Sequence, residues 1–421
     1  MKNNSVLKVR RSKLTGAVNL SGAKNSALRL LAASILTNDR VVLENYPAPL
    51  LDCQVHVDML SALGKASVLT SEDSISIAEL GTLKSKLEWS GRSIRNTLLI
   101  LGALVARTGK GMVPLPGGCQ LGDRKYDLHV MLLESLGAKV WSEDGYLCAE
   151  ATSGLKGGDI FLPLRSTGAT ENSIISAVLA TGVTRIWNPH IRPEIIDLIN
   201  MLNAMGAKIT VFGQEHIEVV GVSTLSGVTH RVIPDNMEAI TWLAAAVITE
   251  GDIEIIDFPY GDLEVVLAHL KAAGARLYSS DGSLIVRGGS CFPIEISTGP
   301  HPGINSDVQP ILAAWAAKAF GESRIVDLRF PGRYGYAEEM KKMGVRYSVQ
   351  GEMLKISGNR GDLMGANVRA LDLRAGVALA LCGLIAEGET VISDSWQIGR
   401  GYVDLVGKLR NLGADCSGTT G

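Results

Sequence analysis

The chain has 421 residues, of which 46% are hydrophobic and 20% are charged. This is the composition of a globular protein, and the length exceeds what one hydrophobic core usually supports. The formal net charge of −2 gives no indication of nucleic acid or an anionic membrane as a partner. Residues 1–17 lack the apolar run of a secretion signal, and the apolar stretches elsewhere are too short to span a bilayer. We therefore expect a cytoplasmic protein.

Cysteines are scattered along the chain without the spacing of metal ligands. This pattern predicts free thiols in a reducing compartment, and neither a metal nor a cofactor is expected. The six are Cys53, Cys119, Cys148, Cys291, Cys382 and Cys416.

A glycine that closes a similar short phrase recurs six times. The glycines are Gly64, Gly137, Gly206, Gly274, Gly344 and Gly413, and successive ones are 73, 69, 68, 70 and 69 residues apart. Structural repeats usually have periods of roughly 20–50 residues, so this longer period predicts a larger unit of several strands and helices, used six times.

The elements of each repeat follow in a constant order. First comes an apolar run rich in small residues, which predicts a buried helix. These runs are 27–36, 97–106, 174–180, 239–248, 311–320 and 375–385. A turn and a short strand follow in most repeats, and then an amphipathic helix ends at the recurring glycine, which is expected to adopt the left-handed conformation. A further strand follows, as at 139–141 and 208–210.

Six repeats favour two domains of three, with the seam near residues 232–234. The first strand region, residues 7–20, is expected to complete the second domain. The predicted domains are therefore 24–233, with three repeats and a loop around Cys119, and 1–23 plus 234–421, with the other three. A continuous solenoid is the alternative.

Polar and charged side chains gather where the buried helices are expected to begin. Asn, Ser, Thr and Asp are ordinary helix caps there. Lys24 and Arg95 oppose the helix dipole, so capping does not explain them, and they are either solvated cations or ligands of an anion. The expected helix starts are 24–26, 95–97, 170–172, 235–236, 306–307 and 372–374.

A glycine-rich loop at 114–124 surrounds Cys119 and ends at Arg124. Its glycines suit a lid, and nearby cations would lower the pKa of the thiol and make it reactive. A buried, inert cysteine is the alternative. The histidines at 129, 190 and 301 lack ligand spacing and are interpreted as solvated or core residues. Tyr334 and Tyr336 suit either base stacking or aromatic packing.

Several phrases then occur in a characteristic order. They are Ser21-Gly22-Ala23-Lys24-Asn25-Ser26, Gly117-Gly118-Cys119-Gln120-Leu121-Gly122-Asp123-Arg124, Asp127-Leu128-His129, Ser306-Asp307-Val308-Gln309, Asp372-Leu373-Arg374 and Gly399-Arg400-Gly401-Tyr402. Together they resemble the UDP-N-acetylglucosamine enolpyruvyl transferases of peptidoglycan synthesis, over essentially the whole chain. The resemblance implies an α/β fold, a two-domain inside-out α/β barrel built from six βαβαββ repeats.

The resemblance also implies transfer of the enolpyruvyl group of phosphoenolpyruvate to the 3′-hydroxyl of the nucleotide sugar, with release of phosphate. By position in the family's motifs, Cys119 is the general acid and Asp307 takes the hydroxyl proton. Lys24, Arg124 and Arg400 hold the phosphate, and Arg333 or Arg374 holds the carboxylate. The residues implied in substrate binding are Asn25, Arg95, Arg124, Asp127, Leu128, Ser166, Thr167, Gly168, Arg333, Asp372 and Arg374. Small-molecule substrates are implied, without nucleic acid or membrane.

The sequence departs from the family's usual residues mainly on the acceptor side. The departures are Leu99, Lys125-Tyr126, Arg192, Ile304-Asn305-Ser306, Gly332, Tyr334 and Tyr336. This pattern keeps open a paralogous transferase with another nucleotide acceptor, such as UMP. A nucleotide-binding regulator without catalysis is the third hypothesis. The relative of the shikimate pathway is disfavoured, because the Lys24-Asn25 phrase and the Cys119 loop are not its pattern.

Overall fold

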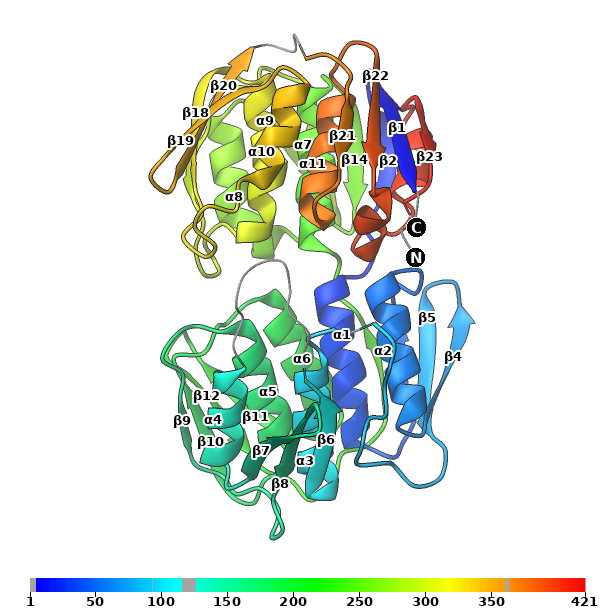
Figure 1. The fold of residues 1–421 in the computed structure, drawn as a ribbon, viewed down its shortest axis with the longest axis vertical. Coiled ribbons are helices and arrows are strands. Elements are labelled where there is room, and N and C mark those ends of the chain that lie inside the picture. The colour runs from blue at the N-terminus through cyan, green and yellow to red at the C-terminus, as the bar shows by residue number, and fades with distance from the viewer. Residues whose placement is uncertain (1–4, 93, 116–125, 360–362, 421) are drawn as a thin grey trace. The chain divides into compact units, whose positions relative to one another are not determined.

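The computed structural model describes residues 5–92, 94–115, 126–359 and 363–420 (Figure 1). The chain forms two compact units. Unit 1 is Met1–Ser21 with Pro234–Gly421, and unit 2 is Gly22–Ile233, so the chain passes between the units twice.

Unit 2 contains the first six α-helices, and its elements alternate along the chain. Its helices are α1 (Lys24–Ala33), η1 (Ser34–Leu36), α2 (Leu51–Ala62), α3 (Thr97–Thr108), α4 (Asp127–Ser135), α5 (Thr167–Ala177) and α6 (Pro193–Ala204). Its strands are β3 (Val41–Glu44), β4 (Lys65–Ser71), β5 (Ser74–Glu79), β6 (Lys110–Pro114), β7 (Lys139–Glu143), β8 (Tyr146–Glu150), β9 (Asp159–Phe161), β10 (Val183–Trp187), β11 (Lys208–Phe212), β12 (His216–Val220) and β13 (Val228–Arg231).

Unit 1 repeats the same alternation. Its helices are α7 (Asn236–Ile248), α8 (Tyr260–Ala272), η2 (Ser306–Val308), α9 (Gln309–Lys318), α10 (Gly335–Lys342), α11 (Leu373–Gly383), η3 (Ser395–Arg400) and α12 (Leu405–Asn411). Its strands are β1 (Val6–Arg10), β2 (Thr15–Asn19), β14 (Asp252–Ile256), β15 (Arg276–Ser280), β16 (Ser283–Arg287), β17 (Glu295–Ser297), β18 (Phe320–Val326), β19 (Arg346–Gln350), β20 (Met353–Asn359), β21 (Asn367–Arg369), β22 (Glu389–Ser393) and β23 (Cys416–Gly418).

Each repeat builds one small sheet with a common strand arrangement. In β9-β10-β12-β11, β9 and β10 are parallel and the other two neighbouring pairs are antiparallel. Four more sheets repeat this pattern. The β6-β8-β7 sheet has three strands, and a parallel bridge from Lys86 to Met112 stands in the fourth position. The predicted α/β fold with six βαβαββ repeats is confirmed.

The apolar runs form the inward helices of each unit. In unit 1, α9 contacts α7 and α11, and in unit 2, α3 contacts α1 and α5. α7 is buried from Met237 to Ile248, which explains its nearly continuous apolar sequence. The second helix of each repeat has one exposed face, as α10 does around its buried Tyr336, Ala337 and Met340. Helices therefore form the centre of each unit and the sheets surround them (Figure 1).

The six recurring glycines end the six amphipathic helices, α2, α4, α6, α8, α10 and α12. Each lies two residues beyond the last helical residue, and their φ angles fall between 88° and 103°. A side chain at such a φ angle clashes with the backbone, so glycine is the residue that fits. The glycine period therefore marks helix ends, as the sequence predicts.

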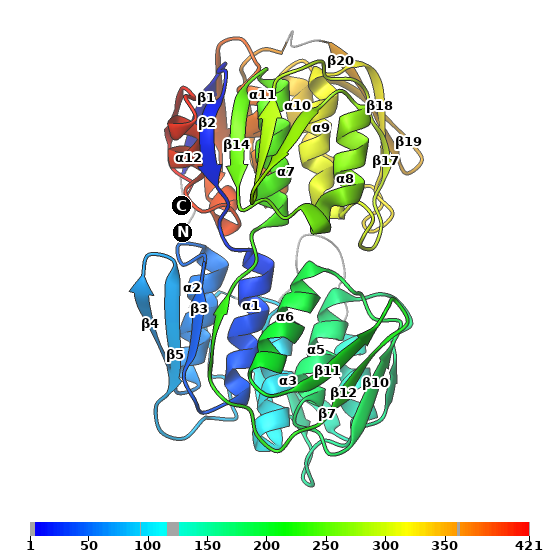
Figure 2. The ribbon, with the colours of Figure 1, turned by 180° about the vertical axis from the view of Figure 1, so that it is seen from behind.

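Both ends of the chain contribute strands to unit 1. β1 lies between β22 and β23 and is antiparallel to both. β2 is parallel to β14, and Figure 2 shows these two strands side by side. In the passages between the units, Ala23 N donates to Ile233 O at 2.7 Å and Asp235 N donates to Ser21 O at 2.9 Å. These hydrogen bonds pair the two passages.

The third inward helix begins earlier than the sequence predicts. α5 starts at Thr167, so residues 170–172, expected at its start, lie buried in its second turn. Ser166 is the N-cap, and its Oγ accepts from Ala169 N at 3.4 Å. The interpretation failed because Asn and Thr inside a buried helix resemble caps in sequence.

The five cysteines in the described part of the chain are free and buried. Of the helices that the structure describes, none is both long enough and apolar enough to cross a bilayer.

Candidate active site

Four of the predicted residues meet in unit 1. Asp307 lies in η2, directly before α9, and Asp372 is the N-cap of α11, where it accepts from the backbone N–H groups of Arg374 and Ala375 at 2.8 and 2.9 Å. Arg333 Nη1 lies 3.0 Å from Asp307 and its Nη2 lies 3.7 Å from Asp372. Arg374 Nε lies 3.7 Å from Asp307. Segments far apart in the sequence thus bring two arginines and two carboxylates together.

Both arginines of this cluster are buried. The exposed fractions of the Arg333 and Arg374 side chains are 11% and 4%. Burial alone would lower the pKa of each guanidinium, because it penalises the charged form. For Arg333 the two neighbouring carboxylates outweigh burial and raise the pKa. For Arg374 the raising groups are Tyr402, Asp307 and Asp235. Both side chains therefore stay cationic.

One donor of each arginine makes no hydrogen bond within the described residues, although the Nε of Arg374 lies at an ion-pair distance of 3.7 Å from Asp307. The Nε atoms of Arg333 and Arg374 are buried and have no hydrogen-bond partner among the residues that the structure describes. Buried donors in native proteins are nearly always paired. A guanidinium presents its N–H groups in a planar fork that matches a carboxylate or phosphate. This arrangement is suited to binding a small anion beside Asp307.

Tyr402 belongs to the same cluster, and sequence reasoning did not assign it to the site. Arg374 Nη1 donates to the Tyr402 hydroxyl at 3.2 Å, and the guanidinium carbon lies 5.5 Å from the ring centre. Thr241 Oγ1 lies 2.7 Å from the same hydroxyl. Asp235, the N-cap of α7, accepts from two backbone N–H groups of that helix. The signal was present in the 399–402 phrase, where only the arginine was singled out.

The two tyrosines near Arg333 serve packing. Tyr334 and Tyr336 are 5% and 3% exposed. The Tyr334 hydroxyl donates to Glu352 O at 2.6 Å, and the Tyr336 hydroxyl donates to Gln309 Oε1. Both rings are buried in the protein interior, so of the two interpretations aromatic packing holds and base stacking does not.

Three cations are predicted to hold the phosphate, and two of them, Lys24 and Arg400, lie within the described residues. Arg400 is half-buried at the end of η3, and its Nη1 donates to Gln397 Oε1 at 3.4 Å. Cys119 and Arg124 lie outside the described residues.

In unit 2, Lys24 is the first residue of α1. Its Nζ lies 3.3 Å from Asp52 Oδ2, in the first turn of α2, and the two side chains are 12% and 7% exposed. The carboxylate offsets the unfavourable position of a cation at a helix N-terminus. Asn25 follows in the same turn and is half-buried. Ser26 Oγ donates to Asp197 on α6, which anchors this turn.

The predicted nucleotide-binding residues lie at the starts of two neighbouring helices of unit 2, α4 and α5. They are Asp127, Leu128, Ser166, Thr167 and Gly168. His129 joins the two helices, because a Cβ at Gly168 would lie 3.4 Å from its Nε2. Thr167 Oγ1 lies 2.8 Å from His190 Nδ1. The structure thus brings these residues together.

His129 is a buried core histidine. Its Nδ1 lies 3.0 Å from Asn172 Nδ2, so the side-chain amide of Asn172 is its hydrogen-bond partner. Burial, reinforced by the charge of Arg95, lowers its pKa to about 4. Arg95 therefore lies within electrostatic range of α4, in the segment before α3.

Arg192, one of the departures on the acceptor side, is the N-cap of α6 and forms a bidentate pair with Glu194, at 2.6 and 2.7 Å. Burial acts to raise the pKa of Glu194, but Arg192 outweighs it and the pKa is lowered. A second buried pair lies close by, between Arg29 Nε and Glu171 Oε1 at 2.6 Å.

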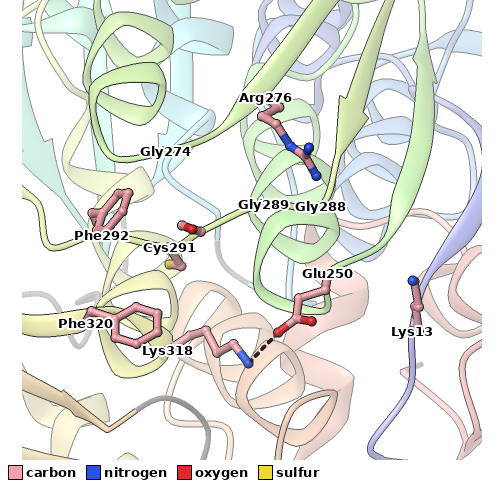
Figure 3. Close-up of a pocket in the computed structure, with 11 residues that line it drawn as sticks. Lys13, Glu250, Gly274, Arg276, Gly288, Gly289, Cys291, Phe292, Lys318 and Phe320 are labelled. Carbon is pink, nitrogen blue, oxygen red and sulfur yellow. Dashed lines mark hydrogen bonds and ion pairs between the residues drawn. The ribbon is translucent and has the colours of Figure 1, made fainter.

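A cavity of about 860 Å³ opens elsewhere in unit 1 (Figure 3). Lys318 and Glu250 form an ion pair of 3.2 Å at its wall, beside Cys291 and the exposed ring of Phe292. No predicted site residue from the described part of the chain lines it. Among the described residues there is also no group of three or more His, Cys, Asp or Glu side chains placed to hold a metal ion.

Comparison with known proteins places this chain in a family. Residues 9–409 match the family described as EPSP synthase (3-phosphoshikimate 1-carboxyvinyltransferase). The chain is 39% identical over 408 residues to UDP-N-acetylglucosamine 1-carboxyvinyltransferase 1 of Staphylococcus aureus (strain N315), covering 96% of each chain. It is 40% identical over 412 residues to UDP-N-acetylglucosamine 1-carboxyvinyltransferase of Caulobacter vibrioides (strain NA1000 / CB15N), covering 96% of this chain and 95% of the relative.

A solved structure agrees. The enolpyruvyl transferase NikO from Streptomyces tendae matches with a TM-score of 0.88 and 25% identity, over 100% of both chains. The fold, the repeats and the sequence matches lead to one conclusion: the chain belongs to the EPSP synthase family and is an enolpyruvyl (1-carboxyvinyl) transferase.

Proposed function

We propose that this enzyme transfers the enolpyruvyl group of phosphoenolpyruvate to the 3′-hydroxyl of UDP-N-acetylglucosamine, with release of phosphate, as the first committed step of peptidoglycan synthesis. Two relatives at 39% and 40% identity bear the name of that activity. The observation that carries the proposal is the pair of buried arginines beside the carboxylate of Asp307 in unit 1, whose Nε atoms make no hydrogen bond to the described residues. This is an anion site next to a group that accepts a proton.

The chemistry defines the groups that the site must supply. The hydroxyl oxygen of the acceptor bonds to C2 of phosphoenolpyruvate, the methylene carbon C3 gains a proton, and the hydroxyl loses one. Phosphate then leaves from C2, and C3 gives up a proton to restore the double bond. In our assignment Asp307 takes the hydroxyl proton and Cys119 delivers the proton to C3.

Negative charge on the donor is met by cations from several segments. We assign the phosphate to Lys24, Arg124 and Arg400, and the carboxylate to Arg333 and Arg374. Asp372 supports this assignment, because it caps α11 and lies 3.7 Å from Arg333. Fixed cations in a dry site stabilise charge that moves onto the leaving phosphate without reorganising during the reaction.

The acceptor is assigned mainly to unit 2. Asn25 contacts the sugar and Arg95 lies nearby. The uridine diphosphate contacts the starts of α4 and α5, at Asp127, Leu128, Ser166, Thr167 and Gly168. The packing of His129 against Gly168 supports this assignment, since it fixes the two helix starts against each other. We take residues 24–233 and residues 1–23 with 234–421 as the two domains that supply these groups.

A second candidate keeps the donor and replaces the acceptor with another nucleotide, such as UMP. The observation that favours it is the Arg192–Glu194 pair at the start of α6, because Arg192 stands where the family commonly has an acid. We place the enzyme in the cytoplasm, which the buried free thiols of the described residues support.

Phosphate release from phosphoenolpyruvate against a panel of acceptors tests the proposal. The panel contains UDP-N-acetylglucosamine, other UDP-sugars, UMP and shikimate 3-phosphate. We expect turnover with UDP-N-acetylglucosamine. Turnover with UMP alone would establish the second candidate, and absence of release with every acceptor would refute both.

A further inference from the structure

A fully buried carboxylate follows directly after β18. Asp327 is 0% exposed. Its Oδ1 accepts from the backbone N–H groups of Arg329 and Phe330, both at 3.0 Å, and from Thr298 Oγ1 at 2.9 Å. A buried carboxylate is costly unless its oxygens are hydrogen-bonded. The first oxygen already caps the loop after β18 and ties it to the end of β17.

The second oxygen extends to two further segments. Asp327 Oδ2 accepts from Ser306 Oγ at 2.6 Å and from Gln309 Nε2 at 3.5 Å. Ser306 immediately precedes Asp307 in η2. Gln309 Nε2 also donates to the backbone oxygen of Arg333 at 3.3 Å. Asp327 is therefore hydrogen-bonded to the side chain of the residue before Asp307 and is linked through Gln309 to the backbone of Arg333.

The ion pair depends on this anchoring for its geometry. Asp307 and Arg333 are 26 positions apart in the sequence, one in the short helical turn η2 and the other in the loop before α10, and their side chains meet at 3.0 Å. Loops hold side chains less rigidly than helices and strands do, so groups that must stay within about 0.5 Å of a productive geometry need support from surrounding hydrogen bonds. Hydrogen bonds from the segments around Asp307 and Arg333 converge on the carboxylate of Asp327, directly from Ser306 and through Gln309.

We propose that Asp327 is a positioning residue for the reaction, acting through Ser306 to place the proton-accepting carboxylate of Asp307 and through Gln309 to place Arg333. The inference rests on the proposed function, because that function gives Asp307 and Arg333 their roles. Asp327 itself touches neither substrate in this scheme.

Two matched variants separate positioning from stability. Ser306→Ala removes the bond to Asp327 on the segment that carries Asp307. Thr298→Ala removes a bond to the same carboxylate, together with the acceptor of the Leu328 N–H group, on a segment without a site residue. We expect Ser306→Ala to lower kcat by about tenfold or more while KM for phosphoenolpyruvate stays within about twofold, because a base displaced by less than 1 Å loses rate.

Thr298→Ala is expected to lower the melting temperature at least as much as Ser306→Ala does, because it removes two hydrogen bonds, and to retain the kcat of the wild type. Ser306→Thr keeps the hydroxyl that bonds to Asp327, so its kcat should be close to that of the wild type and above that of Ser306→Ala. In a crystal structure of the Ser306→Ala variant we expect the carboxylate of Asp307 to be displaced from Arg333. Asp327→Asn turns one acceptor into a donor facing Gln309, and we expect it to raise KM for phosphoenolpyruvate as well as lower kcat.

Equal kcat values for Ser306→Ala and Thr298→Ala, in an active protein, would overturn the inference and leave the proposed function intact. A wild-type protein without turnover would instead refute the proposed function. The inference would then be decided by the crystal structure, where an unmoved Asp307 would overturn it.

Discussion

Arg374 is a buried cation, although burial by itself disfavours the charged form of its side chain. Arg374 is 3% exposed, and its neighbours supply two carboxylates and a tyrosine hydroxyl, while its Nε makes no hydrogen bond to any residue that the structure describes. Burying a charge without full pairing costs stability, so such a group is retained where a ligand completes the pairing. Arg333 repeats the same arrangement beside it.

Arg374→Lys keeps the charge and removes the planar fork. We expect it to lower kcat/KM for phosphoenolpyruvate by about 10²–10³, as loss of one preorganised donor does. Arg369→Lys is the matched control, because the Arg369 side chain is 65% exposed and its guanidinium pairs with Asp394 at the surface of the same unit, at 2.6 Å. Steady-state phosphate release measures both. An Arg374→Lys enzyme as active as the control would remove Arg374 from the carboxylate site.

Cysteine reactivity gives a second test at this scale. Burial raises the pKa of the thiols of Cys53 and Cys382 to about 12, and it also raises the pKa of the thiols at 148, 291 and 416. Thiolates are the reactive form, so these five groups are protected. Cys119, in the glycine-rich loop, is the residue that we expect the epoxide fosfomycin to alkylate.

We therefore expect one adduct per chain, mapped to Cys119 by mass spectrometry, together with loss of phosphate release. The Cys119→Ala protein is the control and should remain unmodified. An adduct on any of the five buried cysteines, or normal phosphate release by Cys119→Ala, would contradict the assigned role.

Among the elements, the amphipathic helices share one ending that can be tested at two sites. Gly206 after α6 and Gly274 after α8 have φ angles of 103° and 98°. A Cβ at Gly206 meets nothing within 4 Å, whereas a Cβ at Gly274 would lie 2.3 Å from the backbone oxygen of Ser290. Alanine would therefore strain the backbone at both positions, and at Gly274 its Cβ would also clash with the backbone oxygen of Ser290.

We expect Gly206→Ala to lower the free energy of unfolding by about 1 kcal/mol and Gly274→Ala by at least about twice as much. Gly206→Asn should cost less than Gly206→Ala, because asparagine tolerates the left-handed region better. Urea unfolding measures all three. Equal losses for the two alanine variants would show that the space around the glycine has no effect.

These helix endings also show why the repeats were predictable. A left-handed residue after a helix restricts the sequence to glycine wherever the motif recurs, so six copies leave a visible period. The inward helices were visible as apolar runs for a similarly local reason. The start of α5 was misplaced by three residues, because Thr170 and Asn172 resemble caps although they point into the core.

The site was predictable only through the family resemblance. Its residues lie on separate segments, and nothing in the sequence around Arg333 indicates that it meets Asp307. Asp327 and Tyr402 were missed because a single Asp after a strand, or a Tyr after a glycine, has many ordinary explanations. Their roles depend on which side chains surround them, which is decided by tertiary packing.

On the scale of the whole molecule, acid should weaken the protein through histidines that are buried neutral. Burial, reinforced by Arg29, lowers the pKa of His56 to about 3, and burial with Arg95 lowers that of His129 to about 4. Between these values and the ordinary pKa near 6.5, the unfolded chain binds protons that the folded chain does not. The contribution of the two neutral histidines to the free energy of unfolding is therefore fully present above about pH 6.5, and it is lost as the pH falls below that value.

From pH 7 to pH 5 each of these histidines should reduce the free energy of unfolding by about 2 kcal/mol. His129→Asn keeps an acceptor for Asn172 and removes the titrating ring, so the pH-dependent loss should shrink by about that amount. His269→Asn, at an exposed position on α8, is the control. Urea unfolding at the two pH values measures the difference, and an unchanged loss in His129→Asn would exclude His129 as its source.

The pairing of β1 with β22 and β23 in unit 1 sets the order in which the two units can complete their sheets during synthesis. Residues 22–233 are contiguous, so this half has all its strands once they have left the ribosome. β1 precedes unit 2 in the sequence, yet its neighbours in the sheet are β22, which begins at Glu389, and β23, which ends at Gly418. During synthesis β1 therefore has neither of these neighbours until residues 389–418 have followed it, so unit 1 completes this sheet only after every strand of unit 2 has been made.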